Sequence, residues 1–393
     1  MKLKKHISVA VYTALIFAAM LLYCFISGFT LDDIGLYSLF LGDFSIGICS
    51  RLLIGSIISV FKETITREWL VSFLRVVTVV TFLITAHYAG STLSQSEKTN
   101  RKSLTLFTLL FVICPFSITV FAGDIFGFID IFCMIVLLMT AYFAESRILI
   151  FTMPLLFVTG IFIHDSYITG YMAPCFGILA YVIIKKYGKK LWASLIFIIS
   201  ALMSVATCIY SVAFSRKTVT MNENEMLGYL AAKGSTTIND VSGYLEDMLL
   251  YSDVRQVAPE DAEKTALNHI TYLIKYAVEG LSTRELIIFV SIIPLVVLMF
   301  FVWIKAIRKQ TGFMEKVPYI LFMLTPVPQL LSLVMSIDFT RFLSTIIITQ
   351  IFYLFLCVRQ HDNDVADVLR HLDDNLHLFA MPGVFVLLAN LFV

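Results

Sequence analysis

Long apolar stretches recur along the whole chain and alternate with short polar segments. About 20 mostly apolar residues in a helix are enough to cross the hydrocarbon core of a membrane. The pattern predicts eleven such spans, at 7–29, 69–91, 104–122, 126–144, 148–163, 166–184, 191–213, 286–304, 318–337, 342–358 and 377–393. We therefore expect an all-α fold, a polytopic transmembrane helical protein.

The composition agrees with this pattern and excludes several function classes. Hydrophobic residues make up 59% of the 393 residues and charged residues only 15%, against about 45–50% and about 25% in soluble domains. A soluble enzyme, a nucleic-acid binder and a disordered scaffold are thereby excluded. The seven cysteines are scattered, which predicts small buried side chains and no disulfide framework.

Two segments between spans are too long to be simple connectors. The first covers 31–68 and contains a short apolar stretch that is typical of a helix lying in the membrane interface. The second, 214–284, is rich in charge and predicts a small helical external loop. We expect three units: an N-terminal transmembrane module at 1–213, the external loop at 214–284 and a C-terminal module at 285–393.

Lysine and arginine in the short loops predict the orientation. With the N-terminus in the cytoplasm, most basic residues of the short loops fall on the cytoplasmic side, as the positive-inside rule requires. The acidic residues of the cytoplasmic side concentrate at 360–375, which is typical of a solvated tail.

Ionisable residues close to membrane depth are expensive and mark functional sites. In the expected topology the unusual ones gather near the external face: Asp32, Asp33, Asp43, Arg51, Arg75, Asp124, Asp130, His164, Asp165, Asp338 and Arg341. Each alone could be a helix cap, a polar turn or an arginine that reaches the headgroups. Together they indicate a site at one membrane boundary, whereas a pore would place such groups at several depths.

Sugar transfer from a lipid-linked donor fits this arrangement. Asp32 or Asp33 would act as general base toward the acceptor hydroxyl, or a carboxylate would hold a divalent cation such as Mg²⁺ or Mn²⁺ against the phosphate. Arg51, Arg75 and Arg341 would bind the phosphate, since guanidinium groups bind it in bidentate fashion. The remaining residues would line the sugar or acceptor cleft: Asp43, Asp124, Asp130, His164, Asp165 and Asp338.

Four short motifs carry a resemblance to a known family. They are Gly28-Phe29-Thr30-Leu31-Asp32-Asp33, the run from Ala122 to Asp130, His164-Asp165 ahead of Pro174, and Asp338-Phe339-Thr340-Arg341-Phe342. The chain resembles the C-type (GT-C) superfamily of integral-membrane glycosyltransferases and the multi-spanning proteins of bacterial surface-polysaccharide clusters. In GT-C enzymes an acidic residue or pair after the first span carries catalysis, and Asp32 and Asp33 match that position.

The resemblance implies a protein of the bacterial cytoplasmic membrane that contributes to cell-surface glycan synthesis. Its partners would be a polyprenyl-phosphate lipid donor, a glycan acceptor and membrane lipids, with no nucleic acid. No Asp-x-Asp follows the first span, so metal dependence stays open. Two alternatives also stay open: a polymerase of the O-antigen or exopolysaccharide type, in which Arg216 and Arg255 would bind pyrophosphate, and a transporter or flippase for lipid-linked sugars or small molecules.

Overall fold

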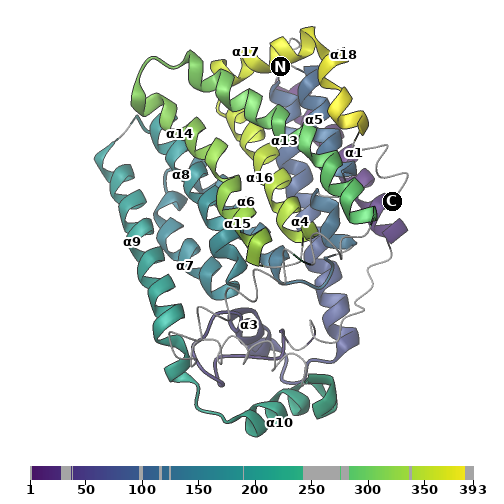
Figure 1. Ribbon diagram of the computed structural model, residues 1–393, viewed down its shortest axis with the longest axis vertical. Coiled ribbons are helices and arrows are strands. Elements are labelled where there is room, and N and C mark those ends of the chain that lie inside the picture. Colours follow the sequence, from purple (N-terminus) through teal and green to yellow (C-terminus); the bar gives the residue numbers. More distant parts are fainter. Residues whose placement is uncertain are drawn as a thin grey trace.

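The chain folds into a bundle of helices that run mostly along one long axis (Figure 1). The computed structural model describes residues 2–27, 37, 39–96, 101–114, 117–123, 125–188, 190–241, 275, 283–335 and 339–385. Within these residues every regular element is a helix. The all-α class expected from the sequence is confirmed.

The helices of the bundle differ widely in length. They are α1 (Lys2–Ser27), α4 (Arg67–Gln95), α5 (Arg101–Ile113), α6 (Asp130–Glu145), α7 (Met153–Ile163), α8 (Ala173–Lys185), α9 (Leu191–Ala213), α13 (Thr283–Lys309), α14 (Phe313–Leu324), α15 (Pro326–Met335) and α16 (Phe339–Arg359). Four helices lie at the ends of the bundle: α3 (Leu53–Phe61), α10 (Glu223–Gly234), α17 (Asn363–Asp374) and α18 (Leu376–Phe379). Short 3-10 or π turns complete the chain: η1 (Ile118–Ala122), η2 (Leu149–Thr152), η3 (Tyr167–Met172) and η4 (Ser215–Thr218).

Six helices of the described residues are long and apolar enough to cross a membrane. They are His6–Ile26, Arg67–Gln95, Tyr167–Lys185, Leu191–Ser211, Val290–Lys309 and Arg341–Arg359. The predicted count of eleven spans is not confirmed.

Several predicted spans contain helices that are too short to cross. The 13 residues of α5 cover about 20 Å, against a hydrocarbon core of about 30 Å. The span expected at 318–337 is divided between α14 and α15 at Thr325. The spans are predicted from the apolar composition of sequence windows, and composition does not show how long an unbroken helix is. The last predicted span, 377–393, runs past the described residues.

Burial separates central from peripheral helices. In α16, 94% of the apolar window is buried inside the protein, whereas the windows of α1 and α9 are 17% and 22% buried. A helix that is apolar on all sides and enclosed by protein belongs to the core. The exposed apolar side chains of α1 and α9 form a surface suited to lipid.

A proline explains the irregular turn ahead of α8. Pro174 lacks a backbone N–H, so it leaves the carbonyl of Gly170, four residues earlier, without its usual helical partner. The backbone forms the π-type turn η3 at this point, and the side chain of Gln329 on α15 donates to the Gly170 carbonyl oxygen at 2.7 Å. Gln329 thereby fixes α15 against the start of α8.

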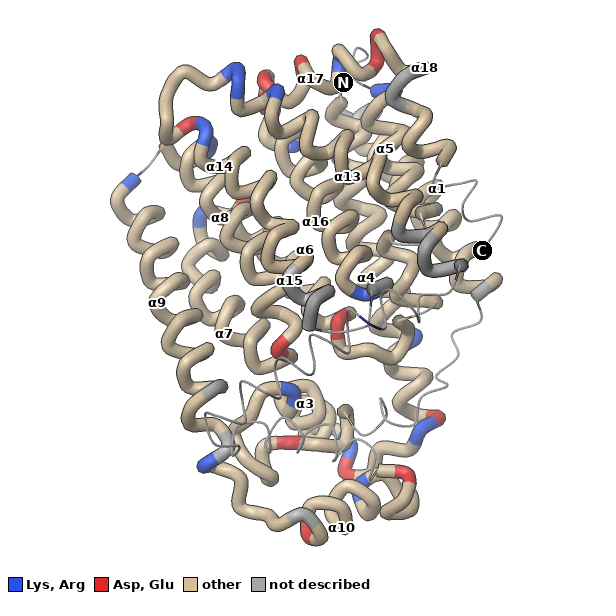
Figure 2. The backbone as a smooth tube through the Cα atoms, viewed as in Figure 1, with Lys and Arg blue, Asp and Glu red and all other residues tan. Residues whose placement is uncertain are grey.

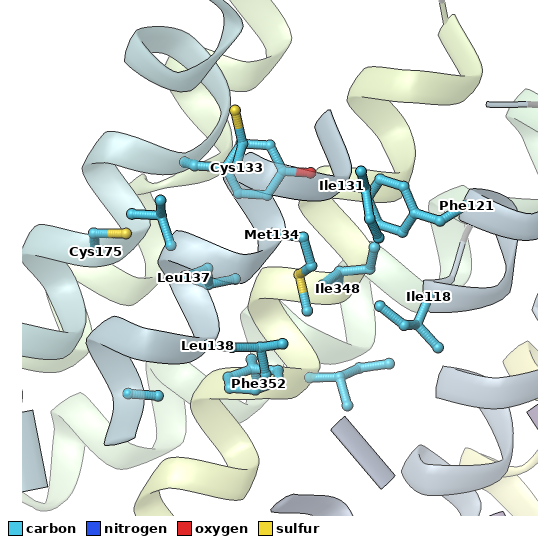
Figure 3. Close-up of a cluster of buried hydrophobic side chains, with 14 of the residues drawn as sticks. Ile118, Phe121, Ile131, Cys133, Met134, Leu137, Leu138, Cys175, Ile348 and Phe352 are labelled. Atoms are coloured by element: carbon cyan, nitrogen blue, oxygen red, sulfur yellow. The ribbon is translucent and has the colours of Figure 1, made fainter. Parts of the chain in front are cut away.

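Charged residues gather mostly toward the two ends of the bundle (Figure 2). We name these the α17 end, where the N-terminus also lies, and the α10 end, which includes α3 (Figure 1). Between them lies an apolar core. Ile131, Met134 and Leu138 of α6 face Ile348 and Phe352 of α16 in this core (Figure 3).

The described part of the first long segment forms a compact loop followed by α3, where the sequence predicts a short apolar helix. Gly55 of α3 lies against the backbone of this loop, and a Cβ atom there would be 1.9 Å from the Gly42 carbonyl oxygen. Glycine is therefore required for the close approach. Six of the seven cysteines are buried and Cys208 is partly buried, as predicted.

The tail at 360–375 is not a solvated segment, and that prediction is wrong. It forms α17, with Val365, Val368, Leu369 and Leu372 buried against the bundle. Apolar side chains at helical spacing give α17 one face that packs on protein, while its acidic side chains face outward or bind the bundle. The prediction considers the charged residues of this segment and not the spacing of its apolar residues.

Candidate functional site

Three residues that are far apart in the sequence meet toward the α10 end. Arg341 of α16 forms an ion pair with Asp130, the first residue of α6, with 2.8 Å between Nη2 and Oδ2. The same Nη2 lies 3.4 Å from Nδ1 of His164, which joins α7 to η3. Asp130 and His164 are buried, at 1% and 7% exposure. The structure thus unites three residues that the sequence singled out separately.

Ser166 completes this cluster, and the sequence reasoning missed it. Its hydroxyl donates to Asp130 Oδ1 at 3.1 Å, and its backbone N–H donates to His164 Nδ1 at 2.9 Å. A serine two residues after a histidine is too common a pattern to indicate a site. Its position beside Asp130 is decided by the packing of α6 against η3.

Arg51 reaches the same region on a strained backbone. Its φ angle is 74°, a left-handed conformation that side chains with a Cβ rarely adopt. Two hydrogen bonds hold this turn on the end of α7: Arg51 N to the Phe162 carbonyl at 3.0 Å, and Ser50 Oγ to the Ile161 carbonyl at 3.0 Å. Arg51 Nε then lies 3.2 Å from Asp165 Oδ2.

The electrostatics of the cluster keep His164 neutral. Burial lowers the pKa of His164 well below its ordinary value, and the guanidinium groups of Arg51 and Arg341 lower the pKa further. Arg51 forms an ion pair with Asp165, and Arg341 forms an ion pair with Asp130. We name the set of Arg51, Asp130, His164, Asp165, Ser166 and Arg341 the α6–α16 site.

Aromatic rings position the Arg341 guanidinium. Its Cζ lies 5.5 Å from the centre of the Phe128 ring and 5.7 Å from that of Phe342. Both contacts are within the range of cation–π attraction. Gly127, with a φ of 93°, permits the turn that places Phe128 just before α6.

Asp43 serves a different network. It accepts hydrogen bonds from Tyr229 Oη at 2.7 Å and Ser59 Oγ at 3.0 Å, and it forms a buried ion pair with Lys233. Burial raises the pKa of Asp43, but the hydrogen bonds from Lys233, Tyr229 and Ser45 outweigh it and leave the pKa lowered. These contacts attach α10 to α3 and the first loop, so Asp43 has a structural role here.

The described contacts do not test the remaining predicted residues. Arg75 is exposed on α4. Asp32, Asp33, Asp124 and Asp338 lie outside the described residues, as does Arg255; the side chain of Arg216 is not described. Their assigned roles stay predictions.

A second charged cluster lies at the α17 end, and the sequence analysis did not identify it. Arg359 binds Glu145 in bidentate fashion, with Nε–Oε1 at 3.1 Å and Nη2–Oε2 at 2.8 Å. Its guanidinium lies 4.4 Å from the centre of the Tyr88 ring. Nearby, Asp362 caps α17 and accepts from Tyr181 Oη at 2.7 Å and Tyr319 Oη at 2.6 Å. This cluster joins α4, α6, α8, α14 and α16.

No group of three or more histidine, cysteine, aspartate or glutamate side chains among the described residues could hold a metal ion. The expected Mg²⁺ or Mn²⁺ therefore stays a prediction. Comparison of the chain with protein-family models, curated proteins and solved structures found no match.

Proposed function

We propose that this chain is a membrane glycosyltransferase that takes a sugar from a polyprenyl-phosphate carrier at the membrane face where the α6–α16 site lies. That face would be the external face of the bacterial cytoplasmic membrane, with the N-terminus in the cytoplasm. The product would be part of a cell-surface glycan.

The arrangement of Arg51 and Arg341 around His164 is the observation that carries the proposal. Arg341 Nη2 lies 3.4 Å from His164 Nδ1, and Arg51 binds Asp165, the residue next to His164. Each guanidinium group is held by a carboxylate. The side chains of Arg51 and Arg341 keep 17% and 13% exposure. Guanidinium groups bind phosphate oxygens through several N–H donors. A lipid phosphate at headgroup level would meet both arginines while its polyprenyl tail stayed among the helices.

Each of these residues would have its own role in the reaction. Arg51, Arg341 and the exposed Arg75 would bind the phosphate that leaves, and Asp32 or Asp33 would take the proton from the acceptor hydroxyl. Asp130, His164 and Asp165 would orient the sugar and the arginines. The amphipathic α3 would cover the donor, with Ile57, Val60 and Phe61 exposed to the membrane interface.

The packing of the core favours a transferase over a transporter. A transport path needs polar groups or water along the membrane depth. Between the Asp130–Arg341 pair and the Glu145–Arg359 pair, the facing sides of α6 and α16 bury an apolar cluster (Figure 3). Among the buried polar side chains of α16 in this stretch, Thr345, Thr349 and Gln350 are hydrogen-bonded to other groups of the protein. This arrangement supports a site restricted to one face.

Binding of the leaving group provides a direct test. The protein in lipid nanodiscs is titrated with decaprenyl phosphate and with uncharged decaprenol, and bound lipid is measured by native mass spectrometry. We expect decaprenyl phosphate to bind preferentially, and R51Q and R341Q each to weaken its binding at least tenfold. The variants R51K and R341K keep the charge and should lose less. R147Q, which changes an exposed arginine outside the site, is the matched control.

Transfer is then measured with decaprenyl-phosphate-linked [¹⁴C]glucose, mannose and galactose and an envelope glycolipid extract as acceptor. Label should move from the carrier to the extract. Equal binding of decaprenyl phosphate and decaprenol, together with no transfer of any of the three sugars, would overturn the proposal. Passage of intact donor across vesicles without a new glycosidic bond would favour the flippase alternative.

A further inference from the structure

The hydrogen bonds around His164 define which ring nitrogen carries its proton. The backbone N–H of Ser166 points at Nδ1 from 2.9 Å, and a backbone N–H can only donate. Arg341 Nη2, 3.4 Å from the same nitrogen, also belongs to a donor-only group. Nδ1 must therefore be the acceptor, and the proton of the neutral ring is on Nε2.

The connector between α7 and η3, which contains His164, stabilises this tautomer. His164 is the C-cap of α7, with its N–H bonded to the Gly160 carbonyl, and Ser166 is the N-cap residue just before η3. The first N–H groups of a helix lack partners within it, so the imidazole satisfies the N–H of Ser166 as a cap would. Rotating the ring or moving the proton to Nδ1 would remove this bond inside a buried site.

The charged groups around the ring also oppose a second proton. Burial lowers the pKa of His164, and the positive charges of Arg51 in the first loop and Arg341 on α16 lower it further. In the described part of the chain, the carboxylates of Asp165 on the connector and Asp130 on α6 form ion pairs with Arg51 and Arg341, respectively. A neutral ring with Nε2–H follows from both the geometry and the charges.

The Nε2–H group is available for a ligand. The hydrogen bonds of His164 among the described residues are made at Nδ1, and the residue is 7% exposed. An N–H donor without a protein partner seeks an acceptor oxygen. Since Arg51 and Arg341 flank the ring, the oxygen that best fits this position carries negative charge or gains it during the reaction.

We propose that His164 is a neutral hydrogen-bond donor that stabilises the leaving phosphate oxygen through Nε2–H, and that Ser166 positions it. This inference depends on the proposed glycosyl transfer. The sugar–phosphate bond breaks toward the phosphate, which keeps the electron pair, and the acceptor oxygen forms the new bond to the sugar. The acceptor proton goes to a carboxylate, and His164 neither takes nor gives a proton.

Two isosteric variants separate the two ring nitrogens. H164N places an amide oxygen near Nδ1, where it can still accept from Ser166 N–H, but it removes the donor at Nε2. H164Q places an amide N–H near Nε2 and keeps the donor. We expect H164N to retain the wild-type melting temperature within a few degrees and to lose about 10²–10³-fold in kcat, the usual effect of removing one oxyanion donor. H164Q should lose less than tenfold.

The pH dependence distinguishes a donor from a base. Transfer by the wild-type protein and by H164Q should have the same pH profile between pH 5.5 and 8. A rising limb near the ordinary histidine pKa that is present in the wild type and absent in H164Q would assign proton transfer to His164 and overturn the inference. Full activity of H164N would overturn it as well.

The tautomer can be measured without any substrate. Nitrogen-15 NMR of ring-labelled histidine in nanodiscs distinguishes protonated from unprotonated ring nitrogens, and the H164Q spectrum assigns the His164 signals among the seven histidines. We expect protonated Nε2 and bare Nδ1 at pH 7. Any other protonation state refutes the inference whatever the reaction is. The expected tautomer without sugar transfer would instead refute the proposed function.

Discussion

Arg341 and Arg359 lie near opposite ends of α16, and each is ion-paired with a carboxylate at the corresponding end of α6. Arg341 binds Asp130, the first residue of α6, and Arg359 binds Glu145, the last. The two arginines are about 27 Å apart along the helix axis. The pairs fix α6 and α16 parallel to each other across an apolar core (Figure 3).

Removing the charge of Arg341 should destabilise the protein more than removing that of Asp130. R341Q leaves the buried carboxylate of Asp130 without its ion-pair partner. Breaking a buried pair in this way costs about 3–5 kcal/mol. D130N removes the carboxylate that pairs with Arg341. The Arg341 side chain is 13% exposed, against 2% for Asp130, so water reaches its charge more easily and the loss should be smaller. A thiol-reactive dye can report unfolding, because six cysteines are buried.

The double variant D130N/R341Q tests whether the pair itself is responsible. It leaves neither charge uncompensated, so it should melt at a higher temperature than R341Q alone. If the double variant lost as much stability as the two single variants together, the ion pair would not be the cause.

Changing Arg359 should affect stability and leave the candidate site intact. R359K loses the bidentate contact with Glu145 and weakens the stacking on Tyr88. We expect a loss of about 1.5–3 kcal/mol in the free energy of unfolding, with decaprenyl phosphate binding unchanged below the melting temperature. A variant of normal stability that failed to bind the lipid would show that the site extends to the α17 end.

Two glycines in exterior helices should respond oppositely to alanine. G55A forces a Cβ to within 1.9 Å of the Gly42 carbonyl oxygen, so α3 must move away from the first loop. In α10 nothing lies within 4 Å of the Cβ position at Gly228, and G228A should stabilise that helix by about 0.5–1 kcal/mol. Thermal unfolding of both variants checks this. Equal stability of G55A and the wild type would be incompatible with the close contact at Gly42.

The attachment of α10 should weaken only in acid. The pKa of Asp43 is lowered in the folded protein. The contribution of its ionised carboxylate to stability is therefore complete above the unfolded pKa, about 3.9, and is lost as the pH falls through the folded value. Hydrogen exchange in 223–234, corrected for the intrinsic rate, should be constant from pH 8 to about pH 5 and increase below about pH 4.

D43N provides the comparison for this pH dependence. It leaves Lys233 buried without its ionic partner, so exchange in α10 should be fast at every pH. Protection of α10 in D43N equal to that of the wild type would show that Asp43 does not hold the two segments together.

The sequence by itself determined the all-α fold, the presence of apolar helices long enough to cross a membrane, and the short helix α3. It also identified Arg51, Asp130, His164, Asp165 and Arg341 as unusual, because ionisable residues close to apolar spans are expensive wherever the helices pack. Hydropathy and charge are local properties, so these conclusions required no contact between distant residues.

The tertiary structure decided which of those residues meet. Asp43 and Asp130 look alike in the sequence, yet one anchors α10 through Lys233 and the other binds Arg341. Ser166 entered the site, the tail became α17 and Glu145 paired with Arg359 because packing brought partners together across long stretches of chain. Side-chain pairing depends on where helices end and how they cross, and a periodic pattern along one chain does not contain that information.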